Sequence, residues 1–184
     1  MSGTDFTIRT AAPSDAPELL AIYAPYVTGT TVSFEYEVPS LEEFTGRVRA
    51  TLEKYPYLAA VRDGVILGYA YASPFHGRAA YGWSAEASIY IRQDLRRGGV
   101  GRALYLALED LLRRQGVLNL NACITWPNPD SVAFHERLGY RPVGRFSQCG
   151  FKLDQWLDVL WMEKMLGDHP IPPKPFIPFK DLES

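Results

Sequence analysis

The alternation of apolar and polar residues predicts short β-strands along the chain. In residues 83–91 the odd positions are apolar and the even positions are mainly polar, a period of two that is typical of a strand with one buried face. The runs 57–61 and 65–73 flank Asp63-Gly64, a pair that favours a tight hairpin turn. The same criteria predict further strands at residues 6–11, 118–125, 140–146 and 157–165.

Apolar residues spaced three and four apart predict helices between these strands. Ser40 and Glu43 form a capping box, and the apolar positions that follow predict an amphipathic helix that ends near Tyr55. A longer apolar stripe begins at Val100 and predicts a second amphipathic helix. Shorter helices are expected after Ser14, through Tyr23, and from Asn128 to Leu138.

The order of the predicted elements, β-α-α-β-β-β-α-β-α-β-β, indicates the fold class. Strands interleaved with helices favour an α/β (α+β) fold with one mixed central β-sheet and helices on both faces. The chain has 184 residues, enough for one domain with a substantial core. We expect residues 1–166 to form this domain and the Pro-rich residues 167–184 to form an extended, poorly packed C-terminal tail.

The composition excludes several classes of protein. Hydrophobic residues make up 47% of the chain and charged residues 22%, which excludes collagen-like chains and long disorder. With 19 basic and 21 acidic residues the net charge is −2, so no nucleic-acid partner is expected. No apolar stretch approaches the roughly 20 residues of a membrane span, and no secretory leader is visible, so we expect a cytoplasmic protein without a membrane partner. Cys123 and Cys149 lack metal-ligand spacing, so we expect buried free thiols and no metal site.

A glycine-rich turn precedes the longer helix and predicts a site for an anion. Gly98, Gly99 and Gly101 open this helix, and the free backbone N–H groups of a helix N-terminus attract negative charge. The turn lacks the Gly-Lys-Ser/Thr of a P-loop and the third glycine of the dinucleotide fingerprint. A diphosphate is the expected ligand, and a structural helix start with solvated arginines is the alternative. The arginines in question are Arg96, Arg97 and Arg102.

The residues from 96 to 101, Arg-Arg-Gly-Gly-Val-Gly, resemble the Gln/Arg-x-x-Gly-x-Gly/Ala signature of the GCN5-related N-acetyltransferases, the GNAT superfamily. The strand at 86–91 and the segment 128–140 also lie where this family has its shared segments. Within the family, the sequence is most similar to the phosphinothricin and methionine sulfone or sulfoximine N-acetyltransferases. The narrower likeness is carried by Ser73, Pro74, Arg78, Tyr81, Trp83, Glu86, His135, Glu136, Leu138, Gly139, Tyr140, Trp156 and Asp158.

The resemblance implies acetyl-CoA as the cofactor and assigns residues to it. The turn residues Gly98, Gly99, Val100 and Gly101, with the three arginines named above, would hold its pyrophosphate. The strand Ile89-Tyr90-Ile91 would splay from its neighbour and pair its backbone with the pantetheine arm, as a peptide adds to a sheet edge. A backbone N–H group of this strand would also stabilise the tetrahedral oxyanion. Asn128 and Ser131 are assigned to the cofactor by resemblance, although both residue types are also common helix caps.

Glu86 is the expected catalytic base. A free α-amine is mostly protonated at neutral pH, since its pKa is about 8, and it must lose a proton before it attacks a thioester. A carboxylate on the polar face of a strand beside the cofactor is suited to accept that proton, and the resemblance puts the subgroup's glutamate at this position. A solvated or salt-bridged strand glutamate is the structural alternative.

His135 is the second candidate catalytic residue. Many members of the superfamily have a tyrosine here that protonates the departing thiolate, whereas this chain has histidine, as in the narrower subgroup. A histidine donates only when it is protonated, and its usual pKa of about 6.5 makes that fraction modest at pH 7. A histidine that is hydrogen-bonded within its helix, or that assists in aligning the substrate, is the alternative.

The expected function is acetylation of the amine of a small amino-acid-like substrate by direct transfer from acetyl-CoA. Phe34, Arg78 and Tyr81, together with Glu86, are the candidate acceptor-binding residues, and Arg78 is suited to a carboxylate or phosphinate. Acetylation of a protein N-terminus or another amine stays open, since acceptor loops vary freely on one scaffold. A non-catalytic acyl-CoA-binding sensor is the alternative of a different class. The aromatic-rich final strand favours a homodimer.

Overall fold

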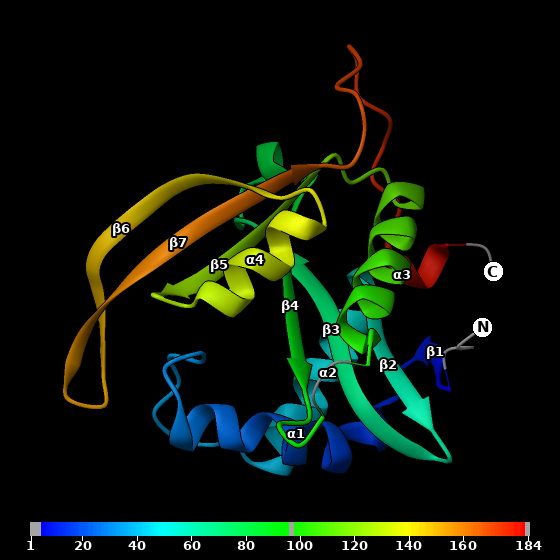
Figure 1. The fold of residues 1–184 in the computed structure, drawn as a ribbon. Coiled ribbons are helices and arrows are strands. Elements are labelled where there is room, and N and C mark those ends of the chain that lie inside the picture. The colour runs from blue at the N-terminus through cyan, green and yellow to red at the C-terminus, as the bar shows by residue number, and fades with distance from the viewer. Residues whose placement is uncertain (1–4, 96–97, 183–184) are drawn as a thin grey trace.

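The computed structural model describes residues 5–95 and 98–182, and within them seven strands form one mixed sheet in the order β1-β2-β3-β4-β5-β7-β6 (Figure 1). The fold class expected from the sequence is confirmed. The strands are β1 (Thr7–Thr10), β2 (Tyr57–Arg62), β3 (Val65–Pro74), β4 (Ser84–Ile91), β5 (Asn119–Trp126), β6 (Arg141–Lys152) and β7 (Gln155–Met165).

Helices cover both faces of the sheet, as the sequence predicts. On one face α1 and α2 pack over the half of the sheet that contains β2 and β3, burying Leu19 and Val48 with Tyr57 and Tyr69. On the other face α3 buries a leucine stripe against the small side chains of β3 and β4, and α4 packs beside it. The helices are α1 (Ala16–Gly29), α2 (Leu41–Lys54), α3 (Val100–Arg114) and α4 (Pro129–Arg137), with 3-10 turns at Pro13–Asp15, Ala79–Tyr81 and Phe179–Asp181.

Local sequence signals explain two of these elements. The Ser40 side chain accepts a hydrogen bond of 3.1 Å from the Glu43 backbone N–H, which caps α2. Asp63 and Gly64 both adopt positive φ values, 50° and 81°, which are those of the tight turn that the Asp-Gly pair predicts between β2 and β3.

The β6–β7 hairpin is longer than the sequence predicts. The sequence predicts strands at 140–146 and 157–165, whereas β6 runs to Lys152 and the two strands meet at a turn formed by Leu153 and Asp154. β6 is exposed almost throughout, so its sequence has no buried face to produce an alternating pattern. In Figure 1 the hairpin projects from the body of the molecule.

Part of the C-terminal tail contacts the domain, although all of its described residues are exposed or half-buried. Phe176 packs on the ring of Tyr55, with ring centroids 5.4 Å apart. The buried Gln115 side chain donates to the Ile177 carbonyl at 2.8 Å, and the Trp83 indole donates to the Lys174 carbonyl at 2.7 Å. Side chains of the domain thus bind the tail through the carbonyl groups of Lys174 and Ile177. The domain boundary at 166/167 stays a prediction.

Two further observations bear on the composition. The thiols of Cys123 and Cys149 are free, as predicted, but both residues are exposed rather than buried. None of the helices in the described ranges is long and apolar enough to cross a membrane.

Candidate active site

The site begins where β4 and β5 separate. These two strands run parallel, and their pairing is confined to Ser84–Glu86 on β4 and Asn119–Asn121 on β5. Beyond Glu86 the strands diverge, and a small cavity of about 80 Å³ lies between them. The backbone of β4 therefore has an unpaired edge from Ala87 onward.

The register of the sheet shows which groups line that edge. The Arg92 N–H donates to the Leu67 carbonyl at 3.0 Å, so the neighbouring pair Gly68–Ile91 exchanges no backbone hydrogen bonds with each other. By alternation, the N–H and C=O groups of Ile89 and Ile91 are directed away from β3 and into the gap. The Ile91 carbonyl accepts a hydrogen bond of 2.6 Å from the Tyr26 hydroxyl.

A larger cavity of about 770 Å³ continues from this edge to the glycine turn. It is lined by β4 residues, by the start of α3 and by the start of α4. Of the predicted cofactor residues it contains Ile89, Ile91, Gly98, Gly99, Val100, Gly101, Arg102, Asn128 and Ser131. Tyr90 lines the smaller cavity instead, and Arg96 and Arg97 lie outside the described residues.

The glycine turn has the geometry of an anion-binding helix start. Gly99 is the residue preceding α3 and has a φ of 72°, a conformation that a side chain disfavours. A Cβ at Gly101 would lie 3.2 Å from the Phe134 ring, so a side chain here would crowd the contact between α3 and α4. Arg62 and Arg137 also line the cavity. No local sequence pattern predicts these two arginines, because their approach to the cavity depends on the tertiary fold.

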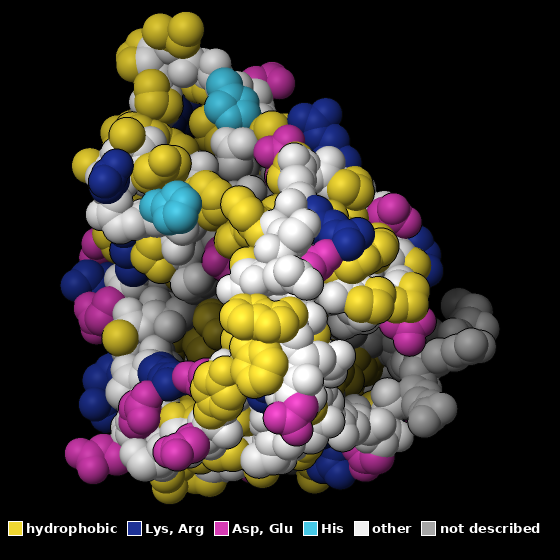
Figure 2. Space-filling model, turned by 90° about the vertical axis from the view of Figure 1, so that its left-hand side faces the viewer, with side chains coloured by type: hydrophobic (Ala, Val, Ile, Leu, Met, Phe, Trp, Pro, Cys, Tyr) yellow, Lys and Arg dark blue, Asp and Glu magenta, His cyan; other side chains and the backbone are white. Residues whose placement is uncertain are grey.

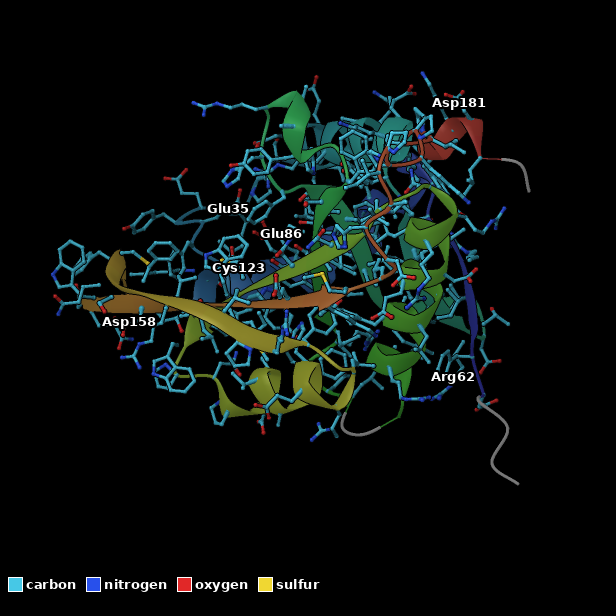
Figure 3. All side chains as sticks on the ribbon, turned by 90° about the horizontal axis from the view of Figure 1, so that it is seen from above. Glu35, Arg62, Glu86, Cys123, Asp158 and Asp181 are labelled. Atoms are coloured by element: carbon cyan, nitrogen blue, oxygen red, sulfur yellow. The ribbon has the colours of Figure 1, made fainter. Side chains whose placement is uncertain are left out.

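Glu86 lies at the closed end of the gap, with Ser73 opposite it on β3 and Asn121 opposite it on β5. Its side chain is partly buried, and this burial raises the pKa of the carboxyl. Figure 3 shows Glu86 and Cys123 close together near the middle of the sheet. Although Cys123 as a residue is exposed, the protein groups packed around its sulfur desolvate the thiol, and together with the Glu86 charge this raises the pKa of the thiol to about 12. The thiol therefore stays protonated and is a poor nucleophile.

His135 lies beneath the same gap and is buried. Its Nδ1 lies 2.8 Å from the Ser131 carbonyl oxygen, and its Nε2 lies 2.9 Å from the Tyr105 hydroxyl. Burial lowers the pKa of the imidazole. The imidazole is therefore neutral, and both of its nitrogens form hydrogen bonds within the protein. This fits a hydrogen-bonded helix histidine better than a proton donor to the thiolate. No sequence pattern predicts a role for Tyr105, because its partner His135 lies on another helix and meets it only in the folded chain.

Asn128 and Ser131 mark the start of α4. The Asn128 side chain accepts a hydrogen bond of 3.1 Å from the Ser131 N–H, so it acts as a helix cap. Both residues also line the two cavities beside β4. Capping and contact with a ligand are compatible, because the cap fixes the start of α4 at the cavity wall.

The predicted acceptor residues lie on two different loops. Phe34 follows α1 and is partly exposed, with its ring against Gly150 of β6. Arg78 and Tyr81 lie on the loop before β4, where Tyr81 packs on Phe75 and His76. Neither Arg78 nor Tyr81 lines the two cavities beside β4.

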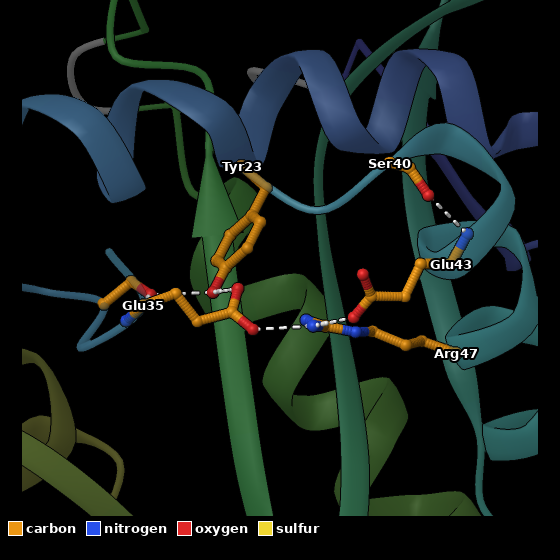
Figure 4. A network of polar contacts seen from close by, with 6 residues as sticks. Tyr23, Glu35, Ser40, Glu43 and Arg47 are labelled. Atoms are coloured by element: carbon orange, nitrogen blue, oxygen red, sulfur yellow. Dashed lines mark hydrogen bonds and ion pairs between the residues drawn. The ribbon is translucent and has the colours of Figure 1, made fainter. Parts of the chain in front are cut away.

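A third cavity, of about 310 Å³, opens on the Glu86 face of the sheet. Its walls are aromatic, and Arg47 of α2 lies at its edge. Arg47 bridges Glu35, at 2.7 Å, and Glu43, while Glu35 accepts a hydrogen bond of 2.7 Å from the Tyr23 hydroxyl (Figure 4). The lining residues are Tyr23, Phe44, Arg47, Ala50, Thr51, Tyr57, Tyr69, Tyr71 and Tyr90.

Comparison with known proteins identifies the family to which the chain belongs. The family model described as the Acetyltransferase (GNAT) domain matches residues 8–161. The chain is 34% identical to a phosphinothricin N-acetyltransferase of Streptomyces viridochromogenes, over 93% of each chain. It is also 34% identical to an L-methionine sulfoximine/L-methionine sulfone acetyltransferase of Pseudomonas paraeruginosa, over 85% of this chain and 92% of the relative.

A solved structure agrees with these relatives. The GNAT superfamily phosphinothricin acetyltransferase from Sinorhizobium meliloti, in complex with AcCoA, superposes with a TM-score of 0.88 at 32% identity, covering 98% of this chain and 100% of that one. The fold and the matches define an acetyltransferase. The chain belongs to the GNAT family, and the resemblance seen in the sequence is confirmed. In the described part of the chain no cluster of three or more His, Cys, Asp or Glu side chains is suited to a metal ion.

Proposed function

We propose that the protein transfers the acetyl group of acetyl-CoA directly to the α-amine of a small amino-acid-like acceptor. The observation that carries this proposal is the position of Glu86 at the closed end of the gap, next to the unpaired edge of β4. The relatives named for phosphinothricin and for methionine sulfoximine or sulfone support the class of acceptor.

The large cavity fits acetyl-CoA by the chemistry of its walls. The N–H groups at the start of α3 and the side chains of Arg62, Arg102 and Arg137 suit a pyrophosphate. The free backbone groups of Ile89 suit the amides of a pantetheine arm, as a strand edge suits a peptide. We assign Arg96 and Arg97 to the same role. Bound acetyl-CoA would supply a thioester, whose acetyl carbonyl carbon is the electrophile that the amine attacks.

In the proposed reaction, Glu86 accepts a proton from the acceptor ammonium and leaves the nitrogen lone pair free. Its raised pKa makes the carboxylate a better base than an exposed glutamate. The neutral nitrogen bonds to the acetyl carbonyl carbon and the C–S bond breaks. The nitrogen loses its second proton, the thiolate takes up a proton and leaves as the free thiol of coenzyme A, and Glu86 returns its proton to solvent. A backbone N–H on the free edge of β4 stabilises the negative charge that develops on the carbonyl oxygen.

The remaining site residues are proposed to bind and align. Asn128 and Ser131 contact the cofactor from the start of α4, and Tyr90 contacts it from β4. His135 aligns this wall through its hydrogen bonds rather than protonating the thiolate. Phe34, Arg78 and Tyr81 bind the acceptor, and the Arg78 guanidinium binds its carboxylate or phosphinate.

An amine panel tests the proposal. Thiol release from acetyl-CoA would be measured with phosphinothricin, methionine sulfone, methionine sulfoximine, the common amino acids and short peptides. We expect turnover on the first three well above the rate without amine and above the rate on peptides. Equal rates on peptides would contradict a small-molecule acceptor. Turnover no better than background across the whole panel, with acetyl-CoA still bound, would favour the non-catalytic sensor.

We also propose a homodimer built on the β6–β7 hairpin. Phe146 and Trp156 on this hairpin are 60% and 63% exposed, and Figure 2 shows hydrophobic side chains gathered on the side of the molecule where the hairpin lies. Apolar patches of this kind commonly mark protein–protein contacts. Sedimentation equilibrium is expected to give twice the mass of the chain, with Trp156→Ser shifting it toward the monomer. A monomeric wild type would refute the dimer.

A cytoplasmic location, without nucleic-acid or membrane partners, completes the proposal. It is supported by the near-neutral net charge of −2 and by the need for acetyl-CoA. Cell fractionation, electrophoretic mobility shifts with DNA and vesicle flotation test the three parts separately.

A further inference from the structure

The tip of the β6–β7 hairpin reaches back to residues 30–36, the segment between α1 and α2 that carries Phe34 and that we call the acceptor loop. In Figure 1 the tip lies beside this segment. Lys152, the last residue of β6, is 3% exposed. Its Nζ donates hydrogen bonds of 2.6 Å to the Val27 carbonyl and of 2.6 Å to the Ser33 carbonyl.

These two carbonyls belong to different elements, so Lys152 ties them together. Val27 lies in the last turn of α1, where carbonyl groups have no partner within the helix and where a positive charge is favourable. Ser33 lies in the acceptor loop, next to Phe34. A single ammonium group thus fixes the distance from the end of α1 to the residue that precedes Phe34.

A buried ammonium group without a carboxylate partner is unusual. Lys152 takes part in none of the ion pairs within the described ranges, and burial lowers its pKa, an effect that the Glu35 charge partly offsets. By contrast, the partly buried Lys164 of β7 pairs with Glu109 at 2.6 Å. Because a lone buried charge is unfavourable for stability, its presence here favours a role in arranging the loop.

Neighbouring contacts hold the same loop from the same side. The Thr125 hydroxyl donates to the Thr31 carbonyl at 2.7 Å, and the Tyr36 hydroxyl donates to the Phe151 carbonyl. Gly150 leaves space for the Phe34 ring, which a Cβ at that position would overlap. The hairpin tip therefore holds the acceptor loop in its middle and at its Tyr36 end, while Thr125 of β5 holds the Thr31 end. Lys152 is the buried charge among these contacts.

We infer that Lys152 is a positioning residue for the acceptor, which it serves by fixing Phe34 and Glu35 through the carbonyls of Val27 and Ser33. This inference rests on the proposed function for its kinetic part, because the loop matters to catalysis only if the acceptor binds beside it. The position of the loop is a property of the chain alone and can be measured without a substrate.

The test compares Lys152→Met with Lys152→Arg and with the control Lys164→Met in the full chain. Methionine keeps the length of the side chain without its donors, whereas arginine restores donors to both carbonyls. Lys164→Met removes the charge partner of a buried carboxylate remote from the loop, so it lowers the Tm without touching the acceptor loop. Hydrogen–deuterium exchange of the peptide spanning residues 27–36 and steady-state kinetics on the best acceptor are measured for each variant.

We expect Lys152→Met to speed exchange in this peptide and to raise the KM for the acceptor about tenfold, since small displacements of positioning groups have large kinetic effects. The KM for acetyl-CoA should change less than about twofold, and Lys152→Arg should recover part of the loss. Lys164→Met should leave both readouts at the wild-type level. Unchanged exchange in Lys152→Met, or an equal rise in both KM values, would overturn the inference. If the wild type acetylates no amine, the proposed function fails, and the exchange comparison still decides whether Lys152 holds the loop.

Discussion

The Tyr105 hydroxyl and Nε2 of His135 lie 2.9 Å apart beneath the gap between β4 and β5. Nδ1 of the same ring faces the Ser131 carbonyl, which only accepts hydrogen bonds, so the ring proton is assigned to Nδ1. Nε2 then accepts from Tyr105. In this arrangement the neutral imidazole has no proton directed into the gap.

The first prediction concerns His135. If His135 were an imidazolium donor, kcat would fall as the pH rises and the ring loses its proton. Because burial lowers the pKa of His135, we expect the kcat of the wild type not to fall between about pH 6 and pH 8. His135→Gln should lower kcat less than about tenfold, well below the effect of losing a catalytic acid. Tyr105→Phe should lower the free energy of unfolding by about 1–3 kcal/mol, because it leaves Nε2 buried and unpaired. A falling limb of kcat that His135→Gln abolishes would restore the donor role.

The second prediction concerns the base. Glu86→Gln cannot accept a proton, so kcat should fall about 100-fold or more. In the wild type, kcat should rise with pH through the raised pKa of Glu86, because only the carboxylate is active. The matched control is Glu163→Gln, a β7 glutamate that pairs with Arg141 at 3.0 Å, and its activity should equal that of the wild type. Undiminished turnover in Glu86→Gln would remove the assignment.

The third prediction follows from the same shift but concerns stability. Since burial raises the pKa of Glu86 above its value in the unfolded chain, the folded state binds more protons between the two pKa values. The stabilisation is therefore full below the unfolded pKa and is lost as the pH rises through the folded pKa. At neutral pH the buried carboxylate is unfavourable, and Glu86→Gln should have a Tm at least as high as that of the wild type. Thermal unfolding at pH 7.5 and pH 5 should show the difference shrinking at the lower pH, whereas a lower Tm at pH 7.5 would contradict the sign.

Sequence patterns were sufficient where one local signal decides the structure. The alternation in β4, the Asp-Gly turn and the glycines before α3 each act over a few residues, and each was found in the predicted place. The hairpin tip was not predicted, because its register shifts between Phe146 and Gly150 and neither face of β6 is buried. Tyr105, Arg62 and Lys152 were missed because their partners are distant in sequence and meet them only in the folded chain.

The fourth prediction concerns Gly150. An alanine here would place its Cβ in the Phe34 ring, and the partly exposed ring would have to turn away. We expect the KM for the acceptor to rise about threefold to tenfold, with little change in Tm, since surface changes usually stay within about 0.5 kcal/mol. Gly144→Ala on the same strand is the control, since a Cβ there meets nothing within 4 Å. Equal acceptor KM values for the two variants would show that the Phe34 ring does not contact the acceptor.

The fifth prediction concerns the tail. Phe176→Ala removes a ring that packs on Tyr55 and lies 5.5 Å from the Lys54 ammonium, so the free energy of unfolding should fall by about 1–2 kcal/mol. Ile171→Ala changes a side chain that is 100% exposed and should stay within about 0.5 kcal/mol of the wild type. Urea unfolding followed by tryptophan fluorescence measures both variants. Equal stability of the two would mean that the tail does not stay docked in solution.

The unpaired edge of β4 has a consequence for association as well as for chemistry. An open strand edge on a surface is a template on which other chains add and aggregate. Here the edge faces β5 across a narrow gap, and Tyr26 closes its far end at the Ile91 carbonyl. A molecule that pairs with it must enter as a single extended chain, because a second sheet cannot fit between the strands. The gap that we propose for the pantetheine arm thus also protects the protein from edge-to-edge aggregation.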